Sequence, residues 1–263
     1  MYAMNFRKAA SADDAVAKLA AAVDGRFLAG GQTLIPTIKQ RLADPSDLIS
    51  LAGAGLSGVS IAGTDVTVGA MMTHAEVAGD RTVQMNIPAV AALAAGIGDP
   101  AVRHRGTIGG SIANNDPAAD YPAAVLGLGA TVRTNRRAIA ADDFFTGLFE
   151  TALDADELIK GVTFPKAERS AYAKFPNPAS RYAMVGVFVA RNAGGVRVAV
   201  TGAGSNGVFR HAGLEAALSA RFSPDAVDGV DVSSDDLMAD IHGSADYRAN
   251  LIKVMAKRAV AAA

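Results

Sequence analysis

Two glycine pairs lie in polar surroundings that could bind a phosphorylated ligand. The first lies in residues 27–36 (FLAGGQTLIP) and the second in residues 103–122 (RHRGTIGGSIANNDPAADYP). Glycine reaches positive φ and lets a ligand approach the main chain, so backbone N–H groups in such loops can donate to phosphate oxygens. Thr33, Thr107 and Ser111 add hydroxyl donors. Two such loops predict a bound diphosphate, and therefore a large nucleotide cofactor.

Neither glycine pair matches the common nucleotide-binding fingerprints. The chain lacks both G-x-G-x-x-G and G-x-x-x-x-G-K-[ST] around these residues, which argues against a Rossmann dinucleotide site and a P-loop. A single glycine pair is more often a tight turn, so the prediction depends on having two.

The second glycine region also carries two carboxylates, Asp116 and Asp120, on either side of Pro117. Such a pair could supply a general acid and base, ligate a metal, cap the loop or accept from a sugar hydroxyl. The phosphate donors just upstream favour the last of these. The four histidines lie far apart in sequence and no third acid has ligand spacing, so we predict no metal site. Ser111 lacks the G-x-S-x-G setting of a nucleophile, and no catalytic residue is assigned.

Composition excludes several classes of function. The 263 residues are 50% hydrophobic and 19% charged with a net charge of −1, which gives no basic face for nucleic acid. No apolar run approaches the roughly 18 residues that a membrane span needs. The first residues lack a basic-then-apolar export signal, so a cytoplasmic location is expected. Cysteine is absent, so this chain can hold no disulfide, thiolate zinc site or cysteine-ligated iron–sulfur cluster.

Hydrophobic periodicity predicts three units, at 1–55, 56–168 and 169–263. The first is a small α/β unit, with helices expected at 12–23 and 34–41 and short strands expected at 26–29 and 47–51. The second is a mixed unit, with a hairpin expected at 59–68, helices at 73–77, 88–95 and 121–128, and a strand at 130–134. Residues 158–164 complete it. Residues 96–120 lack helical periodicity and are expected to form a loop.

The third unit begins after a boundary expected at 165–170. It combines two strands joined by a turn, expected at 182–190 and 196–201, with two helices, expected at 212–220 and 246–262.

Residues 29–36 and 105–123, taken together, resemble the FAD-binding medium subunit of the molybdenum hydroxylases. This is the carbon monoxide dehydrogenase medium-chain type, related to the FAD domain of xanthine dehydrogenase. Further matches follow in the same order at 174–183, 201–204 and 244–248, so the resemblance covers nearly the whole chain. It implies an α+β fold of the vanillyl-alcohol-oxidase (PCMH) type. Two FAD-binding subdomains would hold the cofactor, and a C-terminal domain of antiparallel sheet and helices would cover it.

The resemblance also implies which residues bind FAD. Residues 28–34 and 107–111 would surround the diphosphate, Asp120 would accept from the sugar portion, and Ile97 and Ile159 would pack on the cofactor. The full set is Leu28, Ala29, Gly30, Gly31, Gln32, Thr33, Leu34, Ile97, Thr107, Gly109, Gly110, Ser111, Asn114, Asp116, Asp120, Ile159 and Lys174. No tethering histidine or cysteine is evident, so FAD is expected to be non-covalent. Pro176 departs from the family pattern, in which a basic residue often follows the Lys-Phe pair.

The implied activity is electron transfer within a larger oxidoreductase. In the family a large molybdopterin subunit hydroxylates the substrate, a small subunit carries two [2Fe–2S] clusters, and FAD passes electrons to an external acceptor. A dimer of heterotrimers is what the resemblance suggests. Two alternatives remain open: a stand-alone flavin oxidase, which needs its own substrate pocket and a larger cap, and a non-catalytic nucleotide-binding module.

Overall fold

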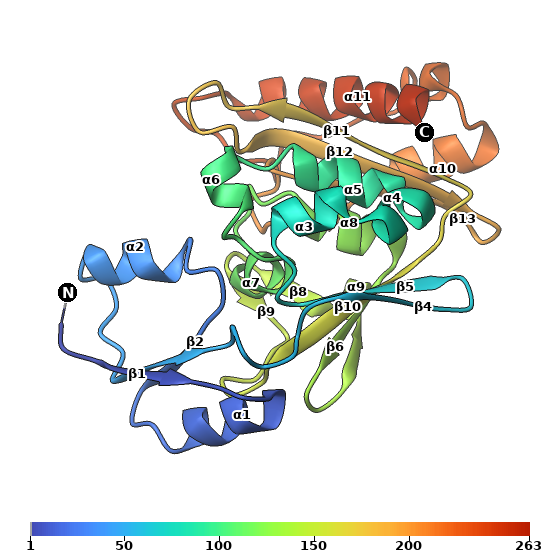
Figure 1. The fold of residues 1–263 in the computed structure, drawn as a ribbon. Helices are drawn as coiled ribbons and strands as arrows, with labels where there is room; N and C mark the ends of the chain where they lie inside the picture. Colours follow the sequence, from blue (N-terminus) through green and yellow to red (C-terminus); the bar gives the residue numbers. More distant parts are fainter. Residues whose placement is uncertain (1) are drawn as a thin grey trace.

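Three β-sheets follow one another along the chain in the computed structural model, which describes residues 2–263 (Figure 1). Each sheet draws its strands from one of the three predicted segments, and a further two-stranded hairpin lies in the second. This arrangement supports dividing the chain near residues 55 and 168, which we propose as its domain organisation.

The first sheet is parallel, with β3 between β1 and β2. The elements of this segment are β1 (Asn5–Lys8), α1 (Ala12–Ala20), β2 (Gly25–Leu28), α2 (Leu34–Lys39) and β3 (Asp47–Ser50). Ser11 caps α1 by accepting from the Asp14 N–H, and α1 buries Ala15 and Leu19. Four elements were predicted and are confirmed. The edge strand β1 was not predicted, because its NFRK sequence is polar and largely exposed.

The second sheet is antiparallel and has the strand order β4-β5-β10-β6-β7. Its strands are β4 (Val59–Ala62), β5 (Asp65–Gly69), β10 (Ile159–Pro165), β6 (Thr131–Thr134) and β7 (Ala138–Ala140). The other elements of this segment are α3 (His74–Gly79), α4 (Arg81–Asn86), α5 (Pro88–Ala95), α6 (Pro100–Arg103), α7 (Ile108–Asn114), α8 (Tyr121–Leu128), α9 (Ala141–Phe144), β8 (Phe145–Gly147) and β9 (Glu150–Thr151).

The expectation that residues 96–120 form a loop is wrong, because this stretch contains α6 and α7. Thr107 caps α7 by accepting from the Gly110 N–H at 3.1 Å. Ile108 and Ile112, one turn apart, are fully buried, and that packing outweighs the low helix propensity of two glycines. The helix ends at Asn115, whose φ of 44° is left-handed.

The third sheet is antiparallel and lies between two layers of helices (Figure 1). It consists of β11 (Arg169–Pro176), β12 (Ala183–Asn192), β13 (Gly195–Thr201) and β14 (Phe209–Arg210). On one face lie α10 (Ala212–Ala220) and α11 (Ala245–Ala262), and on the other lie α5 and α8. A short 3₁₀ helix, η1 (Pro224–Val227), packs on α11. Both faces of β12 are therefore buried, which explains its nearly continuous apolar sequence.

No helix in residues 2–263 combines the length and the apolar character that crossing a bilayer requires.

Candidate functional site

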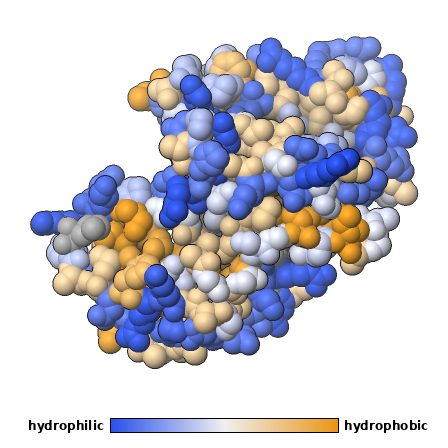
Figure 2. Space-filling view, in the orientation of Figure 1, coloured by the Kyte–Doolittle hydropathy of each residue, from blue (hydrophilic) through white to orange (hydrophobic). Residues whose placement is uncertain are grey.

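A cavity of about 730 Å³ lies between the first two segments, and one loop of the third segment reaches it. Figure 2 shows the surface hollowed between the N-terminal segment and the part of the molecule that carries α6. Every predicted site residue except Lys174 lines this cavity. The structure thus brings together residues up to 131 positions apart in sequence, from Leu28 to Ile159.

The two glycine regions touch each other at the cavity wall. Gly30 lies so close to the chain before α7 that a Cβ atom there would be 1.8 Å from the Arg105 carbonyl oxygen. Only glycine permits this approach. The first glycine pair is therefore part of one wall with the second.

The first glycine loop presents free hydrogen-bond donors. Within the described residues, none of the N–H groups of residues 30–34 donates a hydrogen bond, whereas that of Ile35 donates to the Gly31 carbonyl at 3.1 Å. The loop turns at Gly31, whose φ is +76°. Consecutive free N–H groups around a left-handed residue form a concavity that suits an anion. Residues 30–34 all line the cavity.

The second glycine region uses its N–H groups internally, contrary to the prediction that both loops offer free donors. Ile108 donates to Met72, Gly109 donates to the Ala70 carbonyl at 2.9 Å, and Gly110 donates to the Thr107 hydroxyl. The physical reason is that this stretch is a capped helix packed on the chain after β5. Gly109 is needed for close packing, since a Cβ there would lie 2.6 Å from that of Ala70.

Asp120 lies at the N-terminus of α8 and is bound by two side chains of β11. The Tyr172 hydroxyl donates to one carboxylate oxygen at 2.5 Å, and the Lys174 ammonium donates to the other at 3.1 Å. Burial raises the pKa of the Asp120 carboxyl, while Lys174 and Tyr172 oppose that shift. The ammonium also donates to the Gly96 carbonyl at 2.8 Å. Lys174 therefore fixes Asp120 and the loop before Ile97, and does not itself line the cavity.

Asp116 lines the cavity and accepts from the Ala118 N–H at 2.9 Å. Residues 2–263 contain no group of three His, Cys, Asp or Glu side chains placed to ligate an ion.

Sequence reasoning missed several lining residues. His74 is buried at the wall, and burial lowers the pKa of its imidazole to about 4, so it is neutral near pH 7. Tyr182 places an aromatic ring at the cavity, and burial together with Asp116 and Asp120 raises the pKa of its phenol. Arg181 and Ser180 lie beside it. No local signal marked His74. Ser180, Arg181 and Tyr182 lie within residues 174–183, which carry part of the family resemblance, but they were not assigned to the site because only tertiary packing brings them to the cavity.

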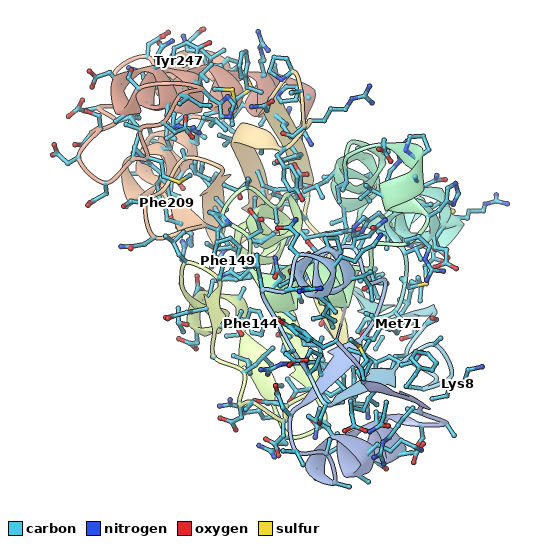
Figure 3. All side chains as sticks on the ribbon, turned by 90° about the vertical axis from the view of Figure 1, so that its left-hand side faces the viewer. Lys8, Met71, Phe144, Phe149, Phe209 and Tyr247 are labelled. Carbon is cyan, nitrogen blue, oxygen red and sulfur yellow. The ribbon has the colours of Figure 1, made fainter. Side chains whose placement is uncertain are left out.

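Much of the remaining wall is apolar. Leu28, Ile97 and Ile159 face the cavity, and Met71 lies where the N-terminal segment meets the second (Figure 3). Ligand pockets of roughly 300–1,000 Å³ combine such apolar walls with a few placed polar groups. A cavity with a row of free N–H donors and apolar surfaces on either side fits a long ligand with a phosphorylated middle.

Comparisons with known proteins match this geometry. Residues 2–167 match the family model described as the FAD binding domain in molybdopterin dehydrogenase. The chain is 34% identical to the nicotine 6-hydroxylase medium subunit of Paenarthrobacter nicotinovorans, over 98% of this chain and 96% of that protein. It is 32% identical to the carbon monoxide dehydrogenase medium chain of Hydrogenophaga pseudoflava, over 91% of this chain and 89% of that protein.

Solved structures agree with the predicted α+β fold, which is confirmed. A structure of reconstituted carbon monoxide dehydrogenase from Oligotropha carboxidovorans superposes with a TM-score of 0.90 at 30% identity, covering 100% of this chain and 98% of that one. The carbon monoxide dehydrogenase of Hydrogenophaga pseudoflava gives a TM-score of 0.88 at 32% identity, covering 100% and 97%.

Proposed function

Because the chain belongs to the family of FAD binding domains in molybdopterin dehydrogenases, we propose that it is the electron-transfer subunit of a molybdenum hydroxylase complex. In this proposal it holds FAD and receives electrons from [2Fe–2S] clusters of a small partner subunit. A large molybdopterin subunit withdraws those electrons from the substrate, and FAD delivers them to an external acceptor.

The observation that carries the proposal is the row of free N–H groups at residues 30–34 on the wall of a large, mainly apolar cavity. A diphosphate needs several donors, and backbone N–H groups provide them without a cationic side chain. FAD is held non-covalently in this proposal, since the lining offers no cysteine to tether it.

The cofactor's parts are assigned to the predicted residues. Residues 30–34 hold the diphosphate, with the Thr33 and Ser111 hydroxyls beside it. Ile97 and Ile159 pack against its ring systems, and Asp120 accepts from a hydroxyl of the sugar portion. Lys174 is a positioning residue that acts through Asp120.

The partners follow from what this chain lacks. It has no cysteine, and the described residues contain no metal-ligating cluster, so the molybdenum and iron–sulfur centres belong to other chains. Several relatives are named medium subunits or medium chains, which supports a heterotrimer. Its pairing into a dimer of heterotrimers, and its location in the cytoplasm, stay predictions.

A flavin-free preparation of the co-purified complex tests the electron-transfer role. Substrate should still bleach the visible absorption of the iron–sulfur clusters, while reduction of a soluble two-electron acceptor dye should be lost. Adding FAD should restore it. Unchanged dye reduction without FAD would show that electrons leave by another route.

A further inference from the structure

The third segment reaches the cavity through a single loop, residues 177–182, which joins β11 to β12. Of the residues after 168, only Ser180, Arg181 and Tyr182 line the cavity. Nothing else from this segment faces the cofactor site proposed above, so this loop decides what the segment contributes there.

Asn177 holds the loop in one shape. Its side-chain oxygen accepts from the N–H groups of Ala179 and Ser180, at 2.9 and 3.2 Å. Its main chain closes the turn, donating to the Tyr182 carbonyl and accepting from the Arg181 N–H, both at 2.8 Å. These bonds place Arg181 at a φ of +62°. That conformation costs a residue with a Cβ about 1–2 kcal/mol, so the loop presents Arg181 in spite of an unfavourable backbone.

The guanidinium of Arg181 is free. In the part of the chain that the structure describes, it forms neither an ion pair nor a side-chain hydrogen bond. The other arginine of the lining, Arg26, pairs with Asp24 at 3.2 Å. Of the lining acids, Glu157 and Asp120 pair with Arg137 and Lys174, whereas Asp99 and Asp116 accept from backbone N–H groups. Arg181 is thus the unpaired cation on the wall.

Its neighbour shows which side of the cavity the loop faces. Burial raises the pKa of the Tyr182 phenol, and the nearby carboxylates of Asp116 and Asp120 raise it further. Asp120 is joined through Lys174 to the Gly96 carbonyl, next to Ile97. The loop therefore lies over the Asp120–Ile97 side, whereas residues 30–34 supply the anion donors.

We propose that Arg181 is the electrostatic partner of the flavin ring and raises its reduction potential. This rests on the proposed function, because it needs FAD in the cavity. Two electrons and one proton convert the neutral oxidised ring into a ring with one negative charge. An unpaired guanidinium on the cavity wall stabilises that charge and adds nothing comparable for the neutral ring.

Arg181→Asn tests the charge without adding strain, because asparagine tolerates positive φ. Reduced FAD should bind about tenfold more weakly and oxidised FAD about as before. For a two-electron couple, tenfold is a fall of about 30 mV in midpoint potential. Arg181→Lys, which keeps the charge, should retain most of the wild-type potential.

Arg41 provides a matched control. It is also an exposed arginine at positive φ, +61°, and lies outside the cavity lining. Arg41→Asn should leave the potential unchanged. The proposal is overturned if Arg181→Asn leaves the potential at the wild-type value, or if it weakens oxidised and reduced FAD equally. Failure of both the wild-type chain and its complex to bind FAD would instead defeat the proposed function.

Discussion

Gly30 and Arg105 meet backbone to backbone, with no room for a side chain between them. This contact joins the loop after β2 to the loop before α7, although the two lie 75 positions apart in sequence. It aligns the free donors of residues 30–34 with the hydroxyls of the second glycine region along one wall.

Gly30→Ala should separate the two loops. The added methyl group would lie 1.8 Å from the Arg105 oxygen, so the backbone must shift, and overpacking of this kind costs about 1–3 kcal/mol. We expect a loss of unfolding free energy in that range and FAD affinity reduced more than tenfold, measured by denaturant titration and calorimetry. Gly194→Ala, where a Cβ meets nothing within 4 Å, should change neither. FAD affinity equal to wild type in Gly30→Ala would show that the contact is not needed.

The ion pair between Asp120 and Lys174 should make a large contribution to the free energy of unfolding. Asp120→Ala leaves the nearly buried Lys174 ammonium without a carboxylate, which costs about 3–5 kcal/mol. Tyr172→Phe removes only the hydroxyl donor to a charged acceptor, which costs about 1.5–3 kcal/mol. Chemical denaturation should rank the variants in that order.

Tyr247→Phe provides the control for the Tyr172 change, because Tyr247 is 42% exposed. It should stay within about 0.5 kcal/mol of wild type. Equal stability of Asp120→Ala and wild type would contradict the structural role of the pair.

His74 should make stability depend on pH. Its pKa is about 4 in the folded chain and 6.5 in the unfolded chain, so between these values only the unfolded chain takes up the proton. The neutral His74 imidazole therefore makes its full contribution to the free energy of unfolding above pH 6.5. This contribution falls by about 3 kcal/mol as the pH drops to 4. His74→Gln, which does not titrate, should lack this part of the acid destabilisation in denaturation curves at several pH values.

His242→Gln, in an exposed turn, should keep the wild-type pH dependence. If His74→Gln and wild type lose stability in parallel from pH 7 to 4, the buried neutral imidazole is refuted.

The sequence could predict the elements whose hydrophobic pattern is local. The apolar run of β12 and the capped helix α1 were predicted correctly for this reason. Helix α7 was missed because Gly109 and Gly110 depress its propensity, while the burial that stabilises it comes from distant parts of the chain.

The candidate site could be predicted where backbone N–H groups form it, as at residues 30–34, because the glycine pair is visible in the sequence. The partners of its side chains were not, since Tyr172 and Asp120 are 52 positions apart and no local pattern reports their contact. The same holds for Arg181, whose place on the cavity wall depends on the fold of the β11–β12 loop.

The most direct test of the central claim compares the affinity of the isolated chain, and of its complex, for FAD, FMN and riboflavin. If residues 30–34 hold a diphosphate, two charge-assisted hydrogen bonds of about 1.5 kcal/mol each predict FAD binding at least a hundredfold tighter than riboflavin. FMN should lie between them. Riboflavin binding as tightly as FAD, or no flavin bound by either preparation, would contradict the account.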